Sequence, residues 1–501
     1  MWSMSAAGAA PTNNACQAPR PANATPSTAP WLAGDGALAR AALQLLATAP
    51  THGLDPRRYG VDDLTGRLAD PGGETAAFAR DLDAAMVRYL CDLHGGRAAG
   101  ALRVSAATDN GFDPLQRLDS ARDAPTLAAA VDAAAPAIAL YGRVKAMLAR
   151  YRELDRLAPA WPALPPPVSS AIRPGEPYAG AAQLHERLQR LGDLDAAAAY
   201  SGDGLYAPAL ADALRRFQAR HGLEEDAVLG PATFTALSVP PTHRIAQLAL
   251  TLERLRWLPA SSTPGRVIAV NVPTYRLWAF DTTDNAAAPA LEMRVIVGAR
   301  GRTATPLFIG SMRHLEFVPY WNVPSSIMQG EIMPKLARNA AYLQQNDMEL
   351  VGADGRVLRV AASEALARLR AGGARVRQRP GPQNVLGDVK FAMPNPMNIY
   401  LHSTSAKELF GRTRRDLSHG CIRVEQPATL AQFVLADRQQ WGGAQVAAAM
   451  NAGRNRTVKL ATPVPVVLFY ATALVDRQGR ALFAQDIYGR DAALIEALGL
   501  E

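Results

Sequence analysis

The chain has 501 residues, of which 49% are hydrophobic and 20% charged, a globular composition long enough for about three domains. Its formal net charge of +8 favours anionic surroundings such as nucleic acid, a membrane surface or an acidic wall polymer. No run of Lys and Arg with interleaved aromatic residues is present, so we expect no nucleic acid partner, and any membrane contact is expected to be peripheral. No segment is long and apolar enough to span a bilayer, and residues 1–10 show no secretory signal.

The three cysteines leave at least one thiol outside any disulfide. Cys421 lies in a glycine-flanked loop and is the candidate reactive thiol. Cys91 falls in a helical pattern and is interpreted as a buried structural thiol. Cys16 lies in residues 1–30, a tail rich in Pro, Ala and Asn that we expect to be disordered. Sequence alone leaves a bond between Cys16 and Cys91 open.

Residues 31–165 show helical periodicity and predict a helical scaffold. Its helices are expected at 37–47, 78–93 and 126–151. The prolines of 159–167 predict an extended, semi-rigid linker. Residues 178–240 then predict a compact unit of three helices, followed by a further helix at 243–258.

After residue 265 the pattern changes to short β-rich runs. These runs cover 267–272, 277–280, 293–297, 398–401 and 466–470. A helical insert at about 325–390 interrupts them, and 476–501 is a C-terminal segment. The predicted fold class is therefore multi-domain α+β, with a mainly β domain at 265–475.

Two stretches of this β domain carry reactive side chains. His402 follows a predicted strand, and Cys421 comes 19 residues later, in the turn 418–424. A thiol attacks as thiolate, so it needs a base or a positive field nearby, and His402 can take its proton. The carbonyl of Ser403 is a candidate to orient the imidazole.

The turn around Cys421 also suits an oxyanion site. Gly420 permits a tight backbone turn, and the amides near His419, Gly420 and Cys421 are candidates to face the oxygen of a tetrahedral intermediate. Arg423 is a candidate to shape this turn or to hold a carboxylate.

The same residues leave two other interpretations open. His402, His419 and Cys421 could be zinc ligands, with Asp416 or water as the fourth ligand, although the His-x-Cys spacing is unusual for zinc. The stretch could also be a purely structural turn.

Tyr400-Leu401-His402 and the turn 418–424 closely resemble the active-site signature of the L,D-transpeptidases. Further stretches resemble the large, multi-domain Gram-negative type: 297–306, 318–327 and 379–387. Two features depart from this pattern. Val318 stands where Asn is expected, and the secretory signal is missing.

The resemblance implies a periplasmic, monomeric peptidoglycan enzyme without cofactor or metal. Cys421 would attack a carbonyl in a tetrapeptide stem, with His402 as general base. D-alanine would leave, and the thioester would pass to an amine of a neighbouring stem, giving a 3→3 cross-link. Partners would be peptidoglycan stem peptides and other wall-synthesis proteins.

Competing activities share these residues. Water as acceptor would make the chain an L,D-carboxypeptidase, and a protein amine would attach that protein to the wall. From other classes, a non-catalytic wall-binding scaffold and a zinc-dependent hydrolase remain alternatives.

The other regions fit the same family. Residues 178–240 resemble a peptidoglycan-binding module, although a plain helical bundle has the same core pattern. Residues 31–165, completed by the helix at 243–258, resemble the family's scaffold domain. The insert at 325–390 would be a flap over the substrate cleft.

Four side chains are expected to bind substrate in that cleft: Tyr320, Trp321, Tyr400 and Arg423. Ordinary packing is the alternative for Tyr320 and Trp321.

Overall fold

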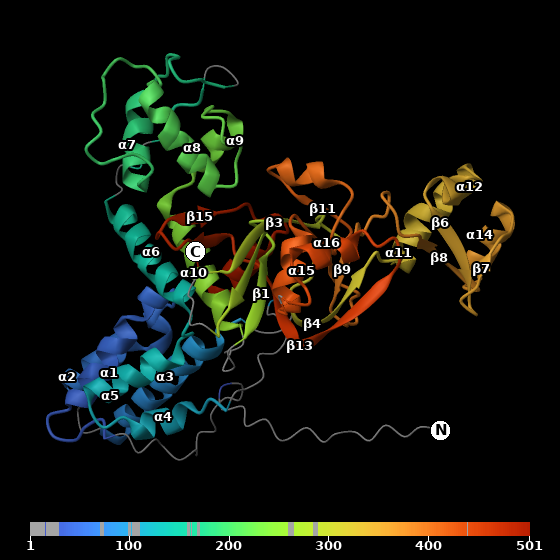
Figure 1. The fold of residues 1–501 in the computed structure, drawn as a ribbon. Helices are drawn as coiled ribbons and strands as arrows, with labels where there is room; N and C mark the ends of the chain where they lie inside the picture. The colour runs from blue at the N-terminus through green and yellow to red at the C-terminus, as the bar shows by residue number, and fades with distance from the viewer. Residues whose placement is uncertain are drawn as a thin grey trace. The chain divides into compact units, whose positions relative to one another are not determined.

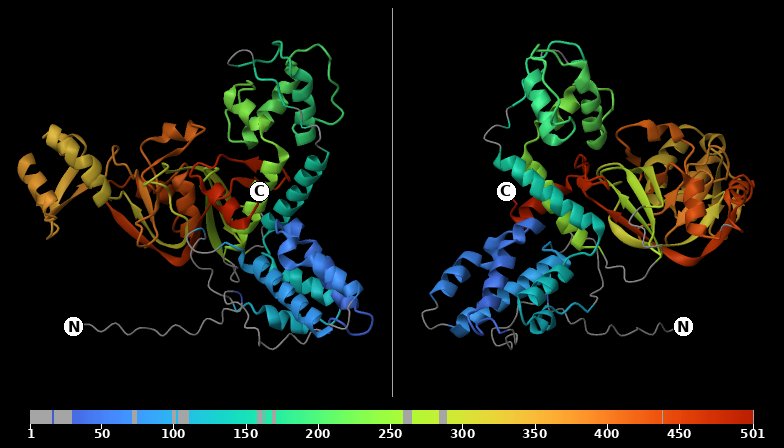
Figure 2. Two further views of the ribbon diagram at one scale, coloured as in Figure 1. Left: turned by 180° about the vertical axis from the view of Figure 1, so that it is seen from behind. Right: turned by 60° about the vertical axis from the view of Figure 1, so that its left-hand side comes forward.

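The computed structural model describes residues 30–70, 75–98, 111–157, 163–167, 171–258, 265–283, 289–437 and 439–500, together with residues 16, 102 and 161. The chain divides into two compact units (Figures 1 and 2). One consists of Met1–Ser262 and Tyr470–Glu501, and the other of Thr263–Phe469. The C-terminal segment thus joins the N-terminal unit from Tyr470 onward, and not from residue 476.

A helical bundle begins the N-terminal unit. Its helices are α1 (Ala37–Ala47), η1 (Ala49–His52), η2 (Pro56–Tyr59), α2 (Val61–Ala69), α3 (Thr75–Gly95), α4 (Pro114–Ser120), α5 (Ala124–Ala134) and α6 (Ala139–Arg156). Leu46, Leu82 and Leu90 are fully buried in its core. The single helix predicted at 126–151 is wrong. The chain bends by 106° between α5 and α6, because Pro136 has no amide hydrogen and its ring clashes with a continuing helix.

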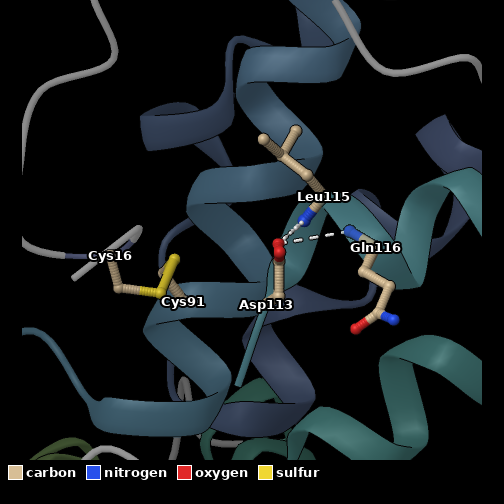
Figure 3. The surroundings of a disulfide bond; sticks show 5 residues. All are labelled: Cys16, Cys91, Asp113, Leu115 and Gln116. Atoms are coloured by element: carbon tan, nitrogen blue, oxygen red, sulfur yellow. Dashed lines mark hydrogen bonds between the residues drawn. A yellow bond between two sulfur atoms is a disulfide. The ribbon is translucent and has the colours of Figure 1, made fainter. Parts of the chain in front are cut away.

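A disulfide joins Cys16 to Cys91 on α3, with 5.5 Å between the two Cα atoms (Figure 3). The interpretation of Cys91 as a buried free thiol is therefore wrong. Cys421 is the free cysteine. Apart from Cys16 and Pro30, the expected disordered tail lies outside the described residues.

The rest of the N-terminal unit comprises a small helical module, two further helices and a hairpin. The module contains α7 (Ala181–Leu191), η4 (Pro208–Leu210), α8 (Ala211–Arg220) and α9 (Pro231–Ser238), and is followed by α10 (Pro241–Arg256), β14 (Ala473–Val475), β15 (Ala481–Phe483) and α17 (Arg490–Leu498). Thr251 on α10 donates a hydrogen bond to the carbonyl of Ala473 (2.7 Å), and Arg254 forms a buried ion pair with Asp491 (2.6 Å). These contacts explain why the C-terminal segment packs with this unit.

The second unit is built on a nine-stranded sheet in the order β11-β3-β12-β10-β9-β4-β13-β1-β2. An additional β2–β3 pairing closes eight of these strands on themselves. The strands are β1 (Arg266–Asn271), β2 (Arg276–Asp281), β3 (Leu291–Gly298), β4 (Phe308–Phe317), β9 (Val389–Ala392), β10 (Leu401–His402), β11 (Asp416–Ser418), β12 (Ile422–Val424) and β13 (Arg456–Phe469). Its helices are η6 (Lys407–Gly411), α15 (Pro427–Leu435) and α16 (Gly443–Met450). The mixed α+β fold class is confirmed.

The expected insert between β4 and β9 has its own core and is not only helical. It contains the four-stranded sheet β5-β8-β6-β7, formed by β5 (Trp321–Asn322), β6 (Met348–Gly352), β7 (Val357–Leu358) and β8 (Ala374–Gln378). Its helices are α11 (Ser325–Ile327), the π-helical turn η5 (Met328–Ile332), α12 (Met333–Arg338), α13 (Tyr342–Gln345) and α14 (Ala362–Arg370).

Just before the insert, Val318 has a φ of +49°. Asn tolerates that conformation better than a β-branched residue does, which explains why Asn would suit this position.

Among the described residues, no single helix is long and apolar enough to cross a membrane, although the bent pair α5 and α6 passes that test when taken together.

Candidate active site

Strand pairing brings the two reactive stretches together. β10 and β12 are parallel neighbours, with Leu401 opposite Ile422 and His402 opposite Arg423. Cys421 directly precedes β12, and the amide of Ile422 donates to the carbonyl of Tyr400 (3.1 Å). The thiol and the imidazole are therefore held by adjacent strands of one sheet.

The Cys421 thiol is partly exposed and rests as a neutral donor. Its Sγ lies 3.6 Å from the carbonyl oxygen of Asn398. Burial raises the pKa of this thiol, while hydrogen bonding by Tyr400 and the charges of Lys390 and Arg423 oppose the rise. The free thiol is thus held un-ionised, beside groups that favour its thiolate.

His402 is 5% exposed and rests as a neutral imidazole. Burial, with the charge of Arg423, lowers its pKa to about 3. Main-chain groups of Ser403 and Leu386 favour the protonated ring. Neither completes a hydrogen bond to Nδ1, which has no partner among the described residues. The role of the Ser403 carbonyl in orienting this ring therefore stays a prediction.

The turn before Cys421 is fixed by short polar contacts. Gly420 has a φ of +115°, a conformation that favours glycine. Its carbonyl accepts a bond from Thr305 Oγ1 (2.8 Å), and its amide donates to Ser418 Oγ (3.1 Å). The Gly420 amide is thus already engaged, whereas it was expected to be an oxyanion donor. A Cβ on Gly298 would lie 1.9 Å from the carbonyl oxygen of Thr303, so only glycine fits there.

The His419 side chain contacts the insert. Its Nε2 lies 2.6 Å from Glu331 Oε1 on η5, and Lys335 lies 3.6 Å from the other oxygen of Glu331. Within the described part of the chain, no three His, Cys, Asp or Glu side chains come together as a metal-ligand group.

The four expected substrate-binding residues have different surroundings. The Tyr400 ring packs edge-on to His402, with 5.7 Å between centroids. Trp321 is 8% exposed and belongs to the core of the insert, whereas the Tyr320 ring lies under the guanidinium of Arg377 (4.4 Å). The buried Nε of Arg423 has no hydrogen-bond partner among the described residues.

Two residues near the thiol were not predicted from the sequence. Lys390, on β9, lies opposite His402 of β10, and its Nζ is 4.9 Å from the centroid of the Tyr400 ring. Asn395 holds the loop that presents the Asn398 carbonyl, with its Nδ2 bonded to the carbonyl of Ile399 (2.7 Å) and its Oδ1 to the amide of Met397 (3.1 Å). Lys390 could have been noticed from the sequence, because it is the one charged residue in the otherwise apolar run Val389–Ala392.

Comparison with known families gives three matches along the chain. Residues 265–466, which contain His402 and Cys421, match the YkuD family, the L,D-transpeptidase catalytic domain. Residues 28–148 match a scaffold domain, and residues 179–237 match the family described as "Putative peptidoglycan binding domain".

A curated relative is similar to part of the chain. A "Putative L,D-transpeptidase" from Haemophilus influenzae is 31% identical over 245 residues, which cover 49% of this chain and 48% of the relative. The aligned region thus spans about half the length of the relative.

Proposed function

We propose that this chain forms 3→3 cross-links between peptidoglycan stem peptides through a Cys421 thioester, because residues 265–466 match the family of L,D-transpeptidase catalytic domains. One observation carries the proposal. The parallel pairing of β10 and β12 holds the free thiol next to the strand of the buried, neutral His402. A neutral imidazole is the form that accepts a proton.

In the first step His402 takes the thiol proton, and the sulfur of Cys421 attacks the carbonyl carbon of the diamino acid in a tetrapeptide stem. The C–S bond forms, the C–N bond to the terminal D-alanine breaks, and the imidazolium returns its proton to the leaving amine. In the second step an amine of a neighbouring stem attacks the thioester. A new C–N bond forms, the C–S bond breaks, and the proton returns to Cys421 through His402.

Arg423 is proposed to bind a carboxylate of the stem, because its buried Nε has no hydrogen-bond partner among the described residues. The amides of His419 and Cys421 are proposed to face the oxyanion, since the Gly420 amide is bonded to Ser418. Tyr320, Trp321 and Tyr400 are proposed to line the cleft beneath the insert.

We further propose that the chain acts in the periplasm. The Cys16–Cys91 disulfide supports this placement, since disulfides persist in oxidising compartments outside the cytosol. The match of residues 179–237 to a peptidoglycan-binding family supports peptidoglycan as the substrate.

The test is incubation of the full chain with purified tetrapeptide muropeptides, followed by mass spectrometry of the products. Tripeptide–tripeptide dimers formed by the native chain, and absent with Cys421→Ala, would support the proposal. Release of D-alanine with tripeptide monomers alone would instead identify an L,D-carboxypeptidase. Dimers that persist with Cys421→Ala would rule out the thioester. A carbapenem adduct of the native chain, located on Cys421 by peptide mapping, would identify the nucleophile independently of any acceptor.

A further inference from the structure

Four titratable side chains lie in one row across neighbouring strands. Glu316 on β4 is opposite Lys390 on β9, Lys390 is opposite His402 on β10, and His402 is opposite Arg423 on β12. Residues directly opposite one another point to the same face of a sheet, with Cβ atoms about 4.5–5.5 Å apart. The proposed base therefore lies between two cations, and the carboxylate stands at the end of the row.

Lys390 contacts Glu316, at one end of this row, and also the ring of Tyr400. Its Nζ lies 2.9 Å from Glu316 Oε1, and the side chains of both residues are 21% exposed. The same Nζ lies 4.9 Å from the centroid of the Tyr400 ring, and Tyr400 is the neighbour of the Cys421 sulfur. The ammonium charge is thus close to the nucleophile and only partly screened by water.

We propose that Lys390 is a positioning residue that stabilises the Cys421 thiolate, and that Glu316 limits this effect by neutralising part of the lysine charge. The inference rests on the proposed function in taking Cys421 as the nucleophile. Lys390 does not touch the reacting atoms. It acts through the field at the sulfur, which also explains why its charge opposes the rise in the thiol's pKa.

Other charged groups also face the site. Arg423 on β12 favours the thiolate, and the carboxylate of Glu408 on η6 favours the charged form of Arg423. From the insert, Glu331 pairs with His419, and on β4 His314 lies 3.5 Å from Glu316. The variants below leave unchanged the other five groups: Arg423, Glu408, Glu331, His419 and His314.

Removing one or the other partner of the Lys390–Glu316 ion pair should shift the pKa of the Cys421 thiol in opposite directions. Lys390→Met removes the cation and should raise the apparent pKa of Cys421 by on the order of 0.5, whereas Glu316→Gln leaves the cation unmatched and should lower it by a similar amount. Lys390→Arg keeps the charge and should restore the native value. A purely structural ion pair predicts no such difference in sign.

The measurement is the pH dependence of iodoacetamide alkylation of the full, oxidised chain. Because Cys16 and Cys91 are disulfide-bonded, alkylation reports Cys421 alone, and Cys421→Ala supplies the blank. The matched control is Glu292→Gln, which removes the carboxylate of the exposed Arg276–Glu292 pair (2.9 Å) on β2 and β3 of the same sheet. Thermal melting checks that each variant is folded.

Opposite shifts for Lys390→Met and Glu316→Gln, with Glu292→Gln unchanged, would support the inference. It is overturned if both variants move the pKa in the same direction, or if neither moves it more than Glu292→Gln does. Alkylation needs neither muropeptide nor acceptor. The two variants could therefore shift the Cys421 pKa in opposite directions while the native chain forms no cross-links. That result would support the role of Lys390 and reject the proposed function.

Discussion

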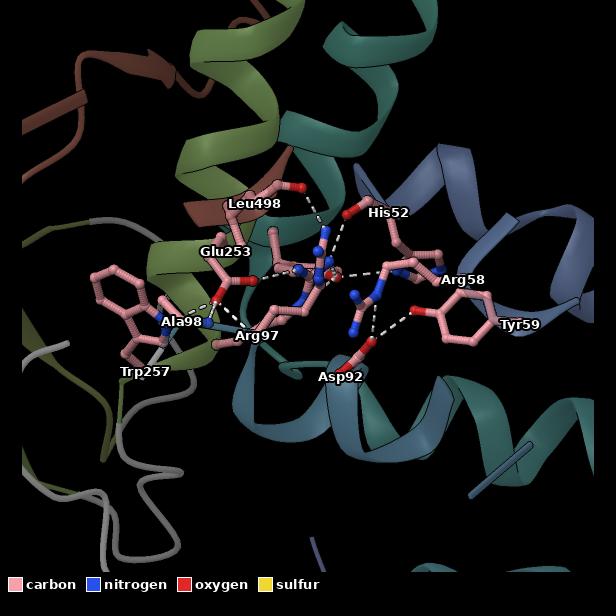
Figure 4. Close-up of polar contacts among 11 residues, drawn as sticks. His52, Arg58, Tyr59, Asp92, Arg97, Ala98, Glu253, Trp257 and Leu498 are labelled. Atoms are coloured by element: carbon pink, nitrogen blue, oxygen red, sulfur yellow. Dashed lines mark hydrogen bonds and ion pairs between the residues drawn. The ribbon is translucent and has the colours of Figure 1, made fainter. Parts of the chain in front are cut away.

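Two buried polar regions, one in each unit of the molecule, differ in how fully their groups are hydrogen-bonded. In the N-terminal unit, Glu253 on α10 is 1% exposed, yet both its carboxylate oxygens accept hydrogen bonds (Figure 4). One oxygen accepts from the amides of Arg97 (2.6 Å) and Ala98 (2.8 Å) and from the Trp257 indole (3.1 Å). The other accepts from Arg256 (3.2 Å), itself 2% exposed. This carboxylate ties together segments that are far apart in the sequence.

Around the candidate active site, polar atoms are buried without partners. Among the described residues, His402 Nδ1, Ser403 Oγ and Arg423 Nε have no hydrogen bond. An unpartnered buried polar group costs stability, about 1–3 kcal/mol each. The comparison indicates that the hydrogen-bonded Glu253 carboxylate supports the fold, whereas the unpartnered groups around His402 are the ones we propose to meet a substrate.

The largest expected effect is the loss of acyl transfer in Cys421→Ala. The change removes the proposed nucleophile, so we expect dimer formation to fall by more than about 1,000-fold. Stability should change little, because the thiol is partly exposed and its bond to the Asn398 carbonyl is long (3.6 Å). Muropeptide turnover and thermal melting measure the two quantities. A large loss of stability would show that Cys421 also supports the fold and would weaken the contrast between the units.

Glu253→Ala tests the saturated network. It leaves the buried Arg256 without its carboxylate, so we expect a loss of about 3–5 kcal/mol in the free energy of unfolding. Urea denaturation measures the change. The matched control is Glu153→Ala, which removes the carboxylate of the exposed Glu153–Arg156 pair. Equal effects of the two variants would contradict the structural role of the network. Cys421 should retain its alkylation rate in folded Glu253→Ala protein.

Buried histidines should make both units acid-sensitive. The pKa of His52 in the first unit and of His402 in the second is lowered to about 3, in each case chiefly by burial. Below pH 6.5 the unfolded chain takes up protons that the folded chain does not. Stability should therefore fall between about pH 6.5 and 3, by roughly 1.4 kcal/mol per pH unit for each histidine.

Melting curves across this pH range test the acid sensitivity. His52→Gln should reduce the pH dependence of the first unit, where burial also lowers the pKa of His221, and His402→Gln should reduce that of the second unit. If stability is constant from pH 6.5 to 4, the two imidazoles are not held neutral.

Glu331→Gln should have the smallest effect. The His419–Glu331 pair is 47% and 38% exposed, and exposed ion pairs contribute about 0–1 kcal/mol. We expect kcat/KM to fall by less than about fivefold and the melting temperature to stay constant. Lys335→Gln, which removes the weaker partner at 3.6 Å, is the matched control. A loss of more than about 100-fold would make the insert an essential part of the reaction centre.

Short-range patterns were enough to predict much of the fold. The run at 267–272 corresponds to β1, that at 277–280 to β2, and that at 293–297 to β3, because alternating apolar residues depend only on near neighbours. Local chemistry likewise identified Cys421 and His402, since few residue types can serve as nucleophile and base at neutral pH.

Those short-range patterns could not predict contacts between residues that are distant in the sequence. The Cys16–Cys91 bond, the packing of Tyr470–Glu501 with the first unit and the sheet within the insert all join residues distant in sequence. The choice of Cys421 and His402 as candidate nucleophile and base therefore came from the sequence itself. The placement of Lys390 beside His402, with Glu316 beyond it, was decided only by strand register, because register depends on contacts between strands that are not adjacent in the chain.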